Sequence, residues 1–355
     1  MRARSSGTTI GSPTVRPASR RSRQASGPDA SGRLPAAAES LTVMTTAWIF
    51  FDTARIDGQR PIEEPWEDMV SLLLAAIVLL AAPAQAAEVE SRSVNVVVTE
   101  DKGAPIQSLA PEEVAVVENG TTRTLQRLEK DRRPLKLALL VDTSEPMGAF
   151  YRLQIVDPIL RFLAKLPEGS TFAVWTTGDR PSKVVDFGQS TTDAAKALRR
   201  VFPTGGNTVF DAIVEASKEL KGEEAGRTAL VIVTGTGIGF TNYSKEQVVE
   251  EGKKSGALVL GAEIEETRAS DQAGAGEVRA SDYDYVLANL AEATGGRREV
   301  LLSAMGTGPT LDSFAGELSS VYRLTYETVP GLKARKVEVK VARPGARVRV
   351  GVSRP

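Results

Sequence analysis

Residues 135–147 read LKLALLVDTSEPM, and this stretch decides the fold. Its first seven residues form a short run rich in Leu and Val, which is typical of a strand buried on both faces. Asp142, Thr143 and Ser144 follow directly at the carboxyl end of that run. Ligands of open α/β sheets bind where strands end and helices begin. The sequence therefore places one carboxylate and two hydroxyls where a ligand would bind.

Strand-like and helix-like segments alternate from this run to residue 319. We expect strands at 135–141, 172–176, 183–187, 229–234, 257–263 and 298–302, and helices at 150–166, 193–201, 209–220, 245–254, 283–293 and 310–319. This alternation predicts one α/β domain, 135–319, with a doubly wound, mostly parallel sheet. The turn at 179–181 is so short that its two strands must be antiparallel, which puts one antiparallel strand at the sheet edge. Pro158 should kink or break the first helix.

Two β-rich flanks enclose this domain. Their alternating apolar positions are Val94, Val96, Val98, Tyr322, Leu324, Tyr326, Val337, Val339 and Val341. Asn119-Gly120, between 114–118 and 121–128, is a strong hairpin signal, and Pro344-Gly345 should turn a second hairpin near the C-terminus. The N-terminal flank, 87–134, is too small to fold alone. We therefore expect the C-terminal flank, 320–355, to join it in one small all-β unit.

The first 68 residues are not predicted to fold. Residues 1–33 carry seven Arg and one acidic residue among Ser, Gly, Pro and Ala, so they offer little apolar surface to offset the entropy cost of ordering. Three interpretations stay open for this segment: a basic arm, a disordered tail, or translated sequence upstream of the true start.

Residues 69–86 have the pattern of a secretory signal peptide. An apolar run at 72–82 precedes the small-x-small triplet at 84–86, which predicts cleavage after Ala86 or Ala87. The run is shorter than the about 20 residues that span a membrane, and an uncleaved anchor is the alternative. We therefore expect an exported protein, either periplasmic or extracellular.

The choice of start codon affects this interpretation. Glu67 and Asp68 precede the apolar run, where a signal peptide normally carries basic residues. A start at Met69, rather than at Met1 or Met44, removes the conflict, because the new amino terminus supplies the positive charge. Met69 is therefore our expected start.

Composition excludes several kinds of chemistry. The 355 residues carry a formal net charge of -1, which gives no reason to expect nucleic acid as a partner, or a membrane beyond the signal segment. The chain has no Cys and no His, which excludes disulfides, thiolate nucleophiles and Ser-His-Asp catalysis and leaves only oxygen-bound hard cations as candidate metals. A G-x-S-x-G elbow is also absent. These observations favour a protein that is not an enzyme, although carboxylate-only catalysis stays formally open.

Three segments resemble the metal loops of von Willebrand factor type A domains. LLVDTSEPM (139–147) is similar to the first loop, PTGGNTVFDAI (203–213) to the second, and ALVIVTGTG (229–237) to the third. The flanking segments resemble those of the bacterial von Willebrand factor A-related proteins: VNVVVTEDKGAPIQSLAPEEVAVVENG before the domain, and VYRLTYETV followed by KVEVKVARPGARVRVG after it. The resemblance covers residues 94–351 and implies the same doubly wound fold.

In this family the three loops surround Mg²⁺, directly or through water, and a carboxylate of the partner completes the ligand shell. The resemblance makes Mg²⁺ a candidate cofactor here, with the candidate ligands Asp142, Ser144 and Thr208. Counting back from Asp211, however, puts Asn207 in the position of the family's Thr. Pro146 and Gly235 replace a Ser and an Asp of the motif, which leaves little charge to hold the ion. The alternative role of the first loop is local, bonding loop amides and capping the next helix.

The resemblance also implies a function, which is to bind a protein partner at the strand-end face with or without metal. The residues expected to contribute are Asp142, Thr143, Ser144, Glu145, Asn207, Thr208 and Thr236. The alternative is a structural component of a cell-envelope assembly, in which the β unit makes the contacts and the α/β domain is a scaffold. The sequence identifies neither the partner nor the oligomeric state.

Overall fold

The computed structural model describes residues 90–221, 227–267, 277–331, 333 and 336–351. The expected N-terminal segment and signal peptide, 1–86, lie outside these residues. Within the described ranges, none of the helices combines the length and the apolar character that crossing a membrane requires.

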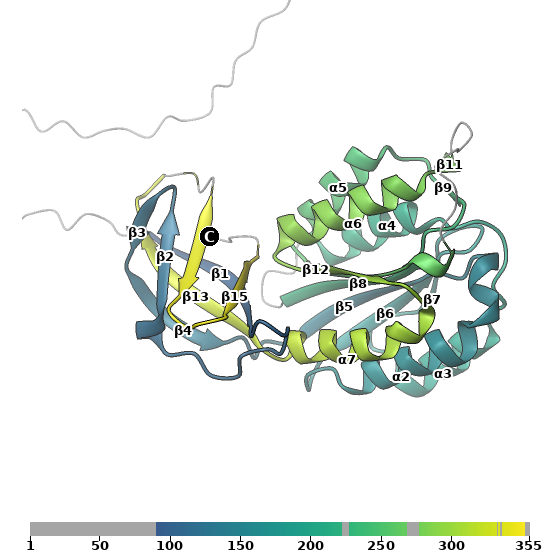
Figure 1. Ribbon diagram of the computed structural model, residues 1–355, viewed down its shortest axis with the longest axis horizontal. Helices are drawn as coiled ribbons and strands as arrows, with labels where there is room; N and C mark the ends of the chain where they lie inside the picture. The colour runs from purple at the N-terminus through teal and green to yellow at the C-terminus, as the bar shows by residue number, and fades with distance from the viewer. Residues whose placement is uncertain (1–89, 222–226, 268–276, 332, 334–335, 352–355) are drawn as a thin grey trace, which may run out of the picture. The chain divides into compact units, whose positions relative to one another are not determined.

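An α/β domain is built on one six-stranded sheet with the order β12-β10-β8-β5-β6-β7 (Figure 1). Its strands are β5 (Leu135–Val141), β6 (Thr171–Thr176), β7 (Ser182–Val185), β8 (Arg227–Gly235), β10 (Leu258–Ile264) and β12 (Arg297–Leu301). All neighbouring strands are parallel except β6 and β7. Because β7 ends the strand order, the predicted mostly parallel sheet with one antiparallel edge strand is confirmed.

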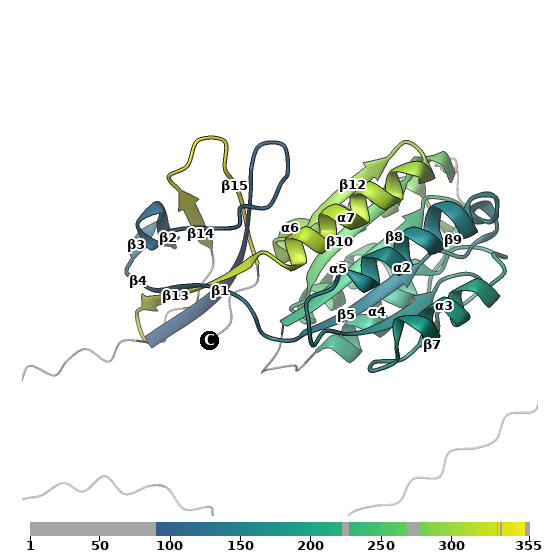
Figure 2. The same cartoon turned by 90° about the horizontal axis from the view of Figure 1, so that it is seen from below.

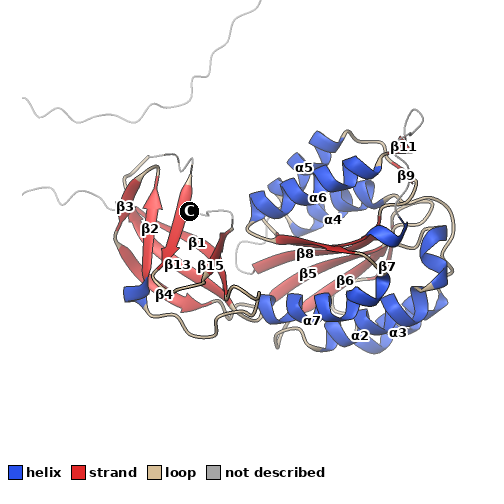
Figure 3. Ribbon diagram, in the orientation of Figure 1, coloured by secondary structure: helices blue, strands red, loops and turns tan. Residues whose placement is uncertain are grey.

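Helices cover both faces of this sheet (Figure 3). They are α2 (Asp157–Ala164), α3 (Thr191–Arg200), α4 (Val209–Leu220), α5 (Lys245–Lys254), α6 (Ala280–Thr294) and α7 (Thr307–Leu318). Successive strand residues point to opposite faces, so β5 contributes Leu139 to a core with α2, α3 and α7 and Leu140 to a core with α4, α5 and α6. Burial on both faces explains why the strands read as continuous apolar runs.

Pro158 marks a break, as predicted. A π-helical turn, η3 (Tyr151–Val156), comes first, and Pro158 lies in the first turn of α2. The hydrogen bonding changes at this point from the π-helical pattern, in which the Asp157 N–H donates to the Arg152 carbonyl, to the α-helical pattern, and Pro158 has no N–H to donate. The remaining short elements are η1 (Pro111–Glu113), η2 (Glu145–Ala149), η4 (Glu265–Thr267), η5 (Ala304–Gly306), β9 (Gly239–Phe240) and β11 (Glu277–Val278).

Strands from both ends of the described chain form a separate all-β unit, seen in Figure 2 as blue and yellow strands side by side. One sheet has the order β15-β1-β13-β4 and the other the order β14-β2-β3. The strands are β1 (Glu90–Thr99), β2 (Val114–Glu118), β3 (Thr121–Arg123), β4 (Leu125–Lys130), β13 (Val321–Thr328), β14 (Val337–Val341) and β15 (Arg347–Val350). An apolar cluster from both sheets, including Val96, Val116 and Leu324, fills the unit. The predicted joining of the two flanks is therefore confirmed.

Two details of this unit were predicted wrongly. The single strand expected at 121–128 is divided at Thr124, and its two halves belong to different sheets. The expected C-terminal hairpin does not form either, because β14 pairs with β2 whereas β15 pairs with β1. The connection crosses between the sheets and is anchored midway, where the Arg343 guanidinium donates to the Glu113 carboxylate (2.8 Å).

Candidate functional site

Loops from four parts of the chain meet at the carboxyl edge of the α/β sheet. We call them the strand-end loops, and they are 142–149 after β5, 177–181 after β6, 201–208 between α3 and α4, and 236–240 after β8. Backbone hydrogen bonds join 201–208 to each of the others: Thr204 N–H to Thr143 O (2.9 Å), Thr208 N–H to Thr177 O (2.8 Å) and Phe240 N–H to Asn207 O (2.9 Å). The four loops therefore form one connected surface.

The Asp142 carboxylate lies at the centre of these loops and is completely buried. Its Oδ1 accepts a hydrogen bond from the Ser144 N–H (2.8 Å). Its Oδ2 accepts from the Gly235 N–H (2.9 Å) and from the Asn207 side-chain amide (2.9 Å). The Thr234 hydroxyl lies 3.4 Å from the same oxygen. Donors of the protein therefore satisfy both carboxylate oxygens.

The second loop brings Asn207, rather than Thr208, to Asp142. The Thr208 hydroxyl instead donates to backbone carbonyls of the loop after β6, at 3.2 Å from the Gly178 oxygen. Counting back from Asp211 therefore identified the residue that meets the carboxylate. What the sequence did not reveal is that an amide nitrogen makes the contact.

Burial raises the pKa of the Asp142 carboxyl group to about 6. Loss of hydration disfavours the charged form, and the hydrogen bonds from Ser144, Gly235 and Thr234 offset only part of that penalty. The carboxyl group therefore binds its proton more tightly in the folded chain than in the unfolded chain.

We expect this group to make the fold less stable as the pH rises. Its stabilising contribution is complete below the ordinary pKa of 3.8 and is lost as the pH rises through about 6. A shift of about two units corresponds to about 3 kcal/mol in the free energy of unfolding. Urea unfolding between pH 4 and pH 7 should show a free energy of unfolding that falls with rising pH in the wild type and not in Asp142→Asn. If the difference in the free energy of unfolding between the two proteins stays constant over this range, the raised pKa of Asp142 is contradicted.

The residues at this position do not fit a Mg²⁺ ion, which requires near-octahedral oxygen ligands at short distances. Both oxygens of Asp142 face N–H donors, and Thr208 is directed to backbone carbonyls. Pro146 and Gly235 bring no side-chain oxygen. Among the described residues, no group of three or more acidic side chains could hold a metal ion. The side chains at this position are therefore suited to hydrogen bonds within the protein and not to cation coordination.

Most of the residues expected to meet a partner are buried. The buried ones are Asp142, Thr143, Ser144, Asn207, Thr208 and Thr236, whereas Glu145 is exposed. In this arrangement the buried side chains hold the loops together: the Thr143 hydroxyl, for example, accepts from the Gly178 N–H (2.8 Å). The Thr236 hydroxyl is buried, has no hydrogen-bond partner within the described part of the chain, and is suited to an ordered water. A partner would therefore meet other residues of the same loops.

Large apolar side chains, which sequence analysis missed, are exposed at this edge. Phe202, Ile238 and Phe240 in the strand-end loops are 74%, 55% and 47% exposed, and Leu302 and Met305, which follow β12, are 83% and 75% exposed. We call these five residues the apolar patch. Loops have no periodic pattern from which exposure could be read, so the only sequence signal was large apolar residues among Gly, Pro and Thr.

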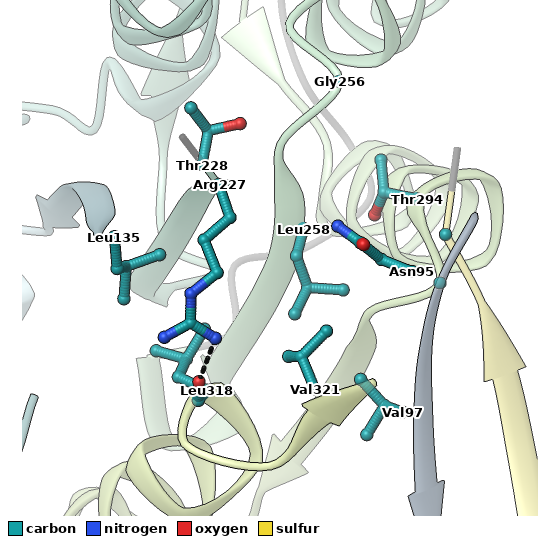
Figure 4. Close-up of a pocket in the computed structure, with 12 residues that line it drawn as sticks. Asn95, Val97, Leu135, Arg227, Thr228, Gly256, Leu258, Thr294, Leu318 and Val321 are labelled. Atoms are coloured by element: carbon teal, nitrogen blue, oxygen red, sulfur yellow. Dashed lines mark hydrogen bonds between the residues drawn. The ribbon is translucent and has the colours of Figure 1, made fainter. Parts of the chain in front are cut away.

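A small cavity lies at the opposite, amino end of the sheet (Figure 4). Its volume of about 30 Å³ is enough for one or two waters and is far below the about 300–1,000 Å³ of small-molecule sites. The buried Arg227 guanidinium lines it and donates to the carbonyls of Leu318 (2.7 Å) and Arg133 (3.1 Å). This cavity therefore offers no room for an organic substrate.

The family of the α/β domain follows from a family model, described as "von Willebrand factor type A domain", that matches residues 137–238. The matched range contains most of β5, all of β8 and the strand-end loops up to residue 238. The chain contains a von Willebrand factor type A domain. The resemblance seen in the three loops is thereby confirmed for this domain, whereas membership of the bacterial group with β flanks stays a prediction. No protein of curated function matches the chain.

Several solved structures are similar to the von Willebrand A domain at low identity. Proximal thread matrix protein 1 from the mussel byssus, with a zinc-occupied MIDAS motif, is 16% identical over 57% of this chain and 49% of its own, with a TM-score of 0.41. The von Willebrand domain of the type V pili tip protein Mfa5 from Porphyromonas gingivalis is 11% identical over 52% and 94% of the chains (TM-score 0.40). A von Willebrand factor type A protein from Catenulispora acidiphila is 10% identical over 74% and 73% (TM-score 0.41). This chain spans about half the length of the mussel protein. Matches this distant assign no ligand or partner to this chain.

Proposed function

We propose that this protein is an exported, non-enzymatic interaction module that binds a protein partner through the apolar patch of its von Willebrand A domain. The observation that carries the proposal is that five large apolar side chains are exposed in loops at one edge of the sheet. Exposed apolar surface of this kind is costly to leave in water and marks interaction sites. Domains of this family are generally interaction modules without catalytic activity.

The patch extends across much of the sheet edge. Phe202 lies beside the ends of β5 and β6, Ile238 and Phe240 follow β8, and Leu302 follows β12. From β6 to β12 there are four steps in the strand order, which at about 4.8 Å each is about 19 Å. A surface of that width can seat a helix or a loop of a protein partner.

The chemistry available at this edge supports binding rather than catalysis. With no His and no Cys in the chain, the acid–base candidates in the strand-end loops are carboxylates, and the central one, Asp142, is completely buried and hydrogen-bonded to the protein. A general acid or base must reach the proton that it transfers. A buried carboxylate beneath closed loops is suited to holding those loops in position.

Export is part of the proposal and rests on the signal pattern of residues 69–86. N-terminal sequencing of protein purified from its source cells tests it. A mature chain that begins at Ala87 or Glu88 would support export, and a chain that retains the apolar run at 72–82 would contradict cleavage.

Site-specific photo-crosslinking in the source cells tests the partner surface. A crosslinking amino acid at Ile238 or Leu302 should give a discrete adduct with one protein. Phe202→Asp should abolish that adduct and weaken binding of the identified partner by at least about 30-fold, the effect of losing a contact worth about 2 kcal/mol.

Val329 provides the matched control, because it is 52% exposed but lies in the β unit, directly after β13. A crosslinker at Val329 should give no adduct with the same partner. Adducts from Val329 but none from Ile238 or Leu302 would contradict the proposal. That outcome would favour the alternative in which the β unit makes the contacts of an envelope assembly.

A further inference from the structure

We infer that the side-chain amide of Asn207 takes the place of the divalent cation that the metal loops of this family bind. Asn207 Nδ2 lies 2.9 Å from Asp142 Oδ2, 2.8 Å from Thr234 Oγ1 and 3.4 Å from the Gly235 carbonyl oxygen. Oxygens of the first and third loops thus converge on one nitrogen of the second loop. The amide joins the three loops as an ion would, by hydrogen bonds instead of coordination.

Hydrogen bonds to the other end of the Asn207 amide, its oxygen Oδ1, fix this orientation. Asn207 Oδ1 accepts hydrogen bonds from the Thr177 hydroxyl (2.8 Å) and from the Val209 N–H (3.0 Å). Rotating the amide by half a turn would place its carbonyl oxygen against the Asp142 carboxylate and its NH₂ group against the Val209 N–H. Both contacts would then pair groups of the same kind. The surrounding donors and acceptors therefore specify which end of Asn207 faces Asp142.

The position that carries the third-loop Asp in this family is Gly235 here, and it has no room for a side chain. A Cβ atom on Gly235 would lie 2.1 Å from Thr267 Oγ1 and 3.2 Å from Met147 Sδ. The Thr267 hydroxyl is itself held there, accepting from the Thr236 N–H (3.0 Å) and donating to the Ile264 carbonyl (3.1 Å). A side chain from another loop thus fills the space that a longer residue at 235 would need.

The charge balance of the site also fits an amide better than an ion. One buried carboxylate, Asp142, faces Asn207, and the other close oxygens are a hydroxyl and a carbonyl. A divalent cation in that position would keep an excess positive charge away from water, which is costly. A neutral amide supplies N–H donors without that cost. The strand-end loops therefore have one arrangement that is independent of divalent cations.

Thermal unfolding of the full chain and of Asn207→Asp, in EDTA and in MgCl₂ or MnCl₂, tests the inference. The wild type should show no metal-dependent shift. Asn207→Asp sets two carboxylates against each other, so its midpoint should fall in EDTA. Mn²⁺ or Mg²⁺ should then raise that midpoint by about 5–10 °C at a hundredfold excess over the dissociation constant.

Asn207→Ala is the matched control, because it removes the amide without adding a charge. It should be less stable than the wild type, with no response to either cation. If Asn207→Asp does not fold in EDTA, recovery of the folded chain on refolding with MnCl₂ is the supporting result.

Three results would overturn the inference. The first is a concentration-dependent rise in the wild-type midpoint with Mg²⁺ or Mn²⁺ that Asp142→Ala removes. The second is an Asn207→Asp chain as stable in EDTA as the wild type. The third is a loss of stability in that variant that neither cation reverses. None of these measurements involves a partner, so the inference and the proposed function can fail separately.

Discussion

Replacing Glu118 with alanine is expected to lower the free energy of unfolding by about 3 kcal/mol or more, because a buried ion-pair network loses its centre. The Glu118 side chain is fully buried at the end of β2. Its Oε1 accepts from Arg92 (2.9 Å) and from the Tyr326 hydroxyl (3.1 Å), and its Oε2 accepts from Arg123 (3.2 Å) and the Thr328 hydroxyl. These partners lie in both sheets of the β unit, so the carboxylate joins the two sheets.

The truncation removes the carboxylate that pairs with Arg123 and one of the two carboxylates that pair with Arg92, the other being Glu90 at 3.3 Å. The Arg92 and Arg123 side chains are only 12% and 15% exposed, so neither can regain full hydration when the carboxylate is removed. Removing one member of a buried charge pair costs more than the pair itself contributes, because the remaining member stays desolvated. Urea unfolding at pH 7, with the wild type as reference, measures the loss directly.

Lowering the pH should reduce the difference in the free energy of unfolding between Glu118→Ala and the wild type. Burial by itself would raise the pKa of Glu118, but the hydrogen bonds from Thr328, Tyr326 and Arg92 outweigh burial and hold it below 4.5. A lowered pKa in the folded state stabilises the fold at pH values above 4.5, and that stabilisation is lost as the pH falls through the folded-state value. The two unfolding curves should therefore approach each other on acidification.

Glu129→Ala is the matched control. Glu129 is also a glutamate of the β unit with an arginine partner, Arg127 at 3.1 Å, but the two side chains are 40% and 70% exposed. An exposed pair of this kind contributes at most about 1 kcal/mol. Equal losses in Glu118→Ala and Glu129→Ala would show that burial of the network does not determine its contribution.

Local signals were sufficient to predict most of the α/β domain. Helix α5 begins and ends at the predicted residues, 245 and 254, and its start is fixed by the Ser244 side chain, which accepts from the Gln247 N–H. The strand β5 is likewise predicted to the residue, because a buried parallel strand is a continuous apolar run bounded by polar residues. Such features depend on neighbours within a few positions, which the sequence displays directly.

The contacts of the polar groups could not be predicted in the same way. Asp142 and Asn207 are 65 positions apart, and Glu118 and Tyr326 are 208 positions apart. Whether a strand-end carboxylate faces a ligand or an amide depends on which distant side chain folds against it. The sequence placed Asp142 at the correct edge, but only the folded loops show that Asn207 covers it.

Gly295 is a position where the addition of a single methyl group is expected to have a large effect. This glycine ends α6 in the left-handed conformation, with φ of 72°. A Cβ atom there would lie 2.5 Å from the backbone nitrogen of Gly351, directly after β15. That nitrogen cannot easily move, because it donates to the Asn95 carbonyl of β1 (2.8 Å). We therefore expect Gly295→Ala to lower the free energy of unfolding by about 3 kcal/mol, of which about 1 is conformational and the rest is overpacking.

Gly331→Ala separates these two contributions. Gly331 has almost the same φ, 73°, but no atom of the described residues lies within 4 Å of the position of its Cβ. This variant should therefore lose only the conformational part, about 1 kcal/mol. Urea unfolding of both variants measures the difference, which is the cost of forcing a methyl group between the end of α6 and the end of β15. Equal losses at the two glycines would mean that the last strand can move away from α6 at little cost. A larger loss at Gly295 would mean that the hydrogen bond to β1 fixes the position of the last strand and resists the added methyl group.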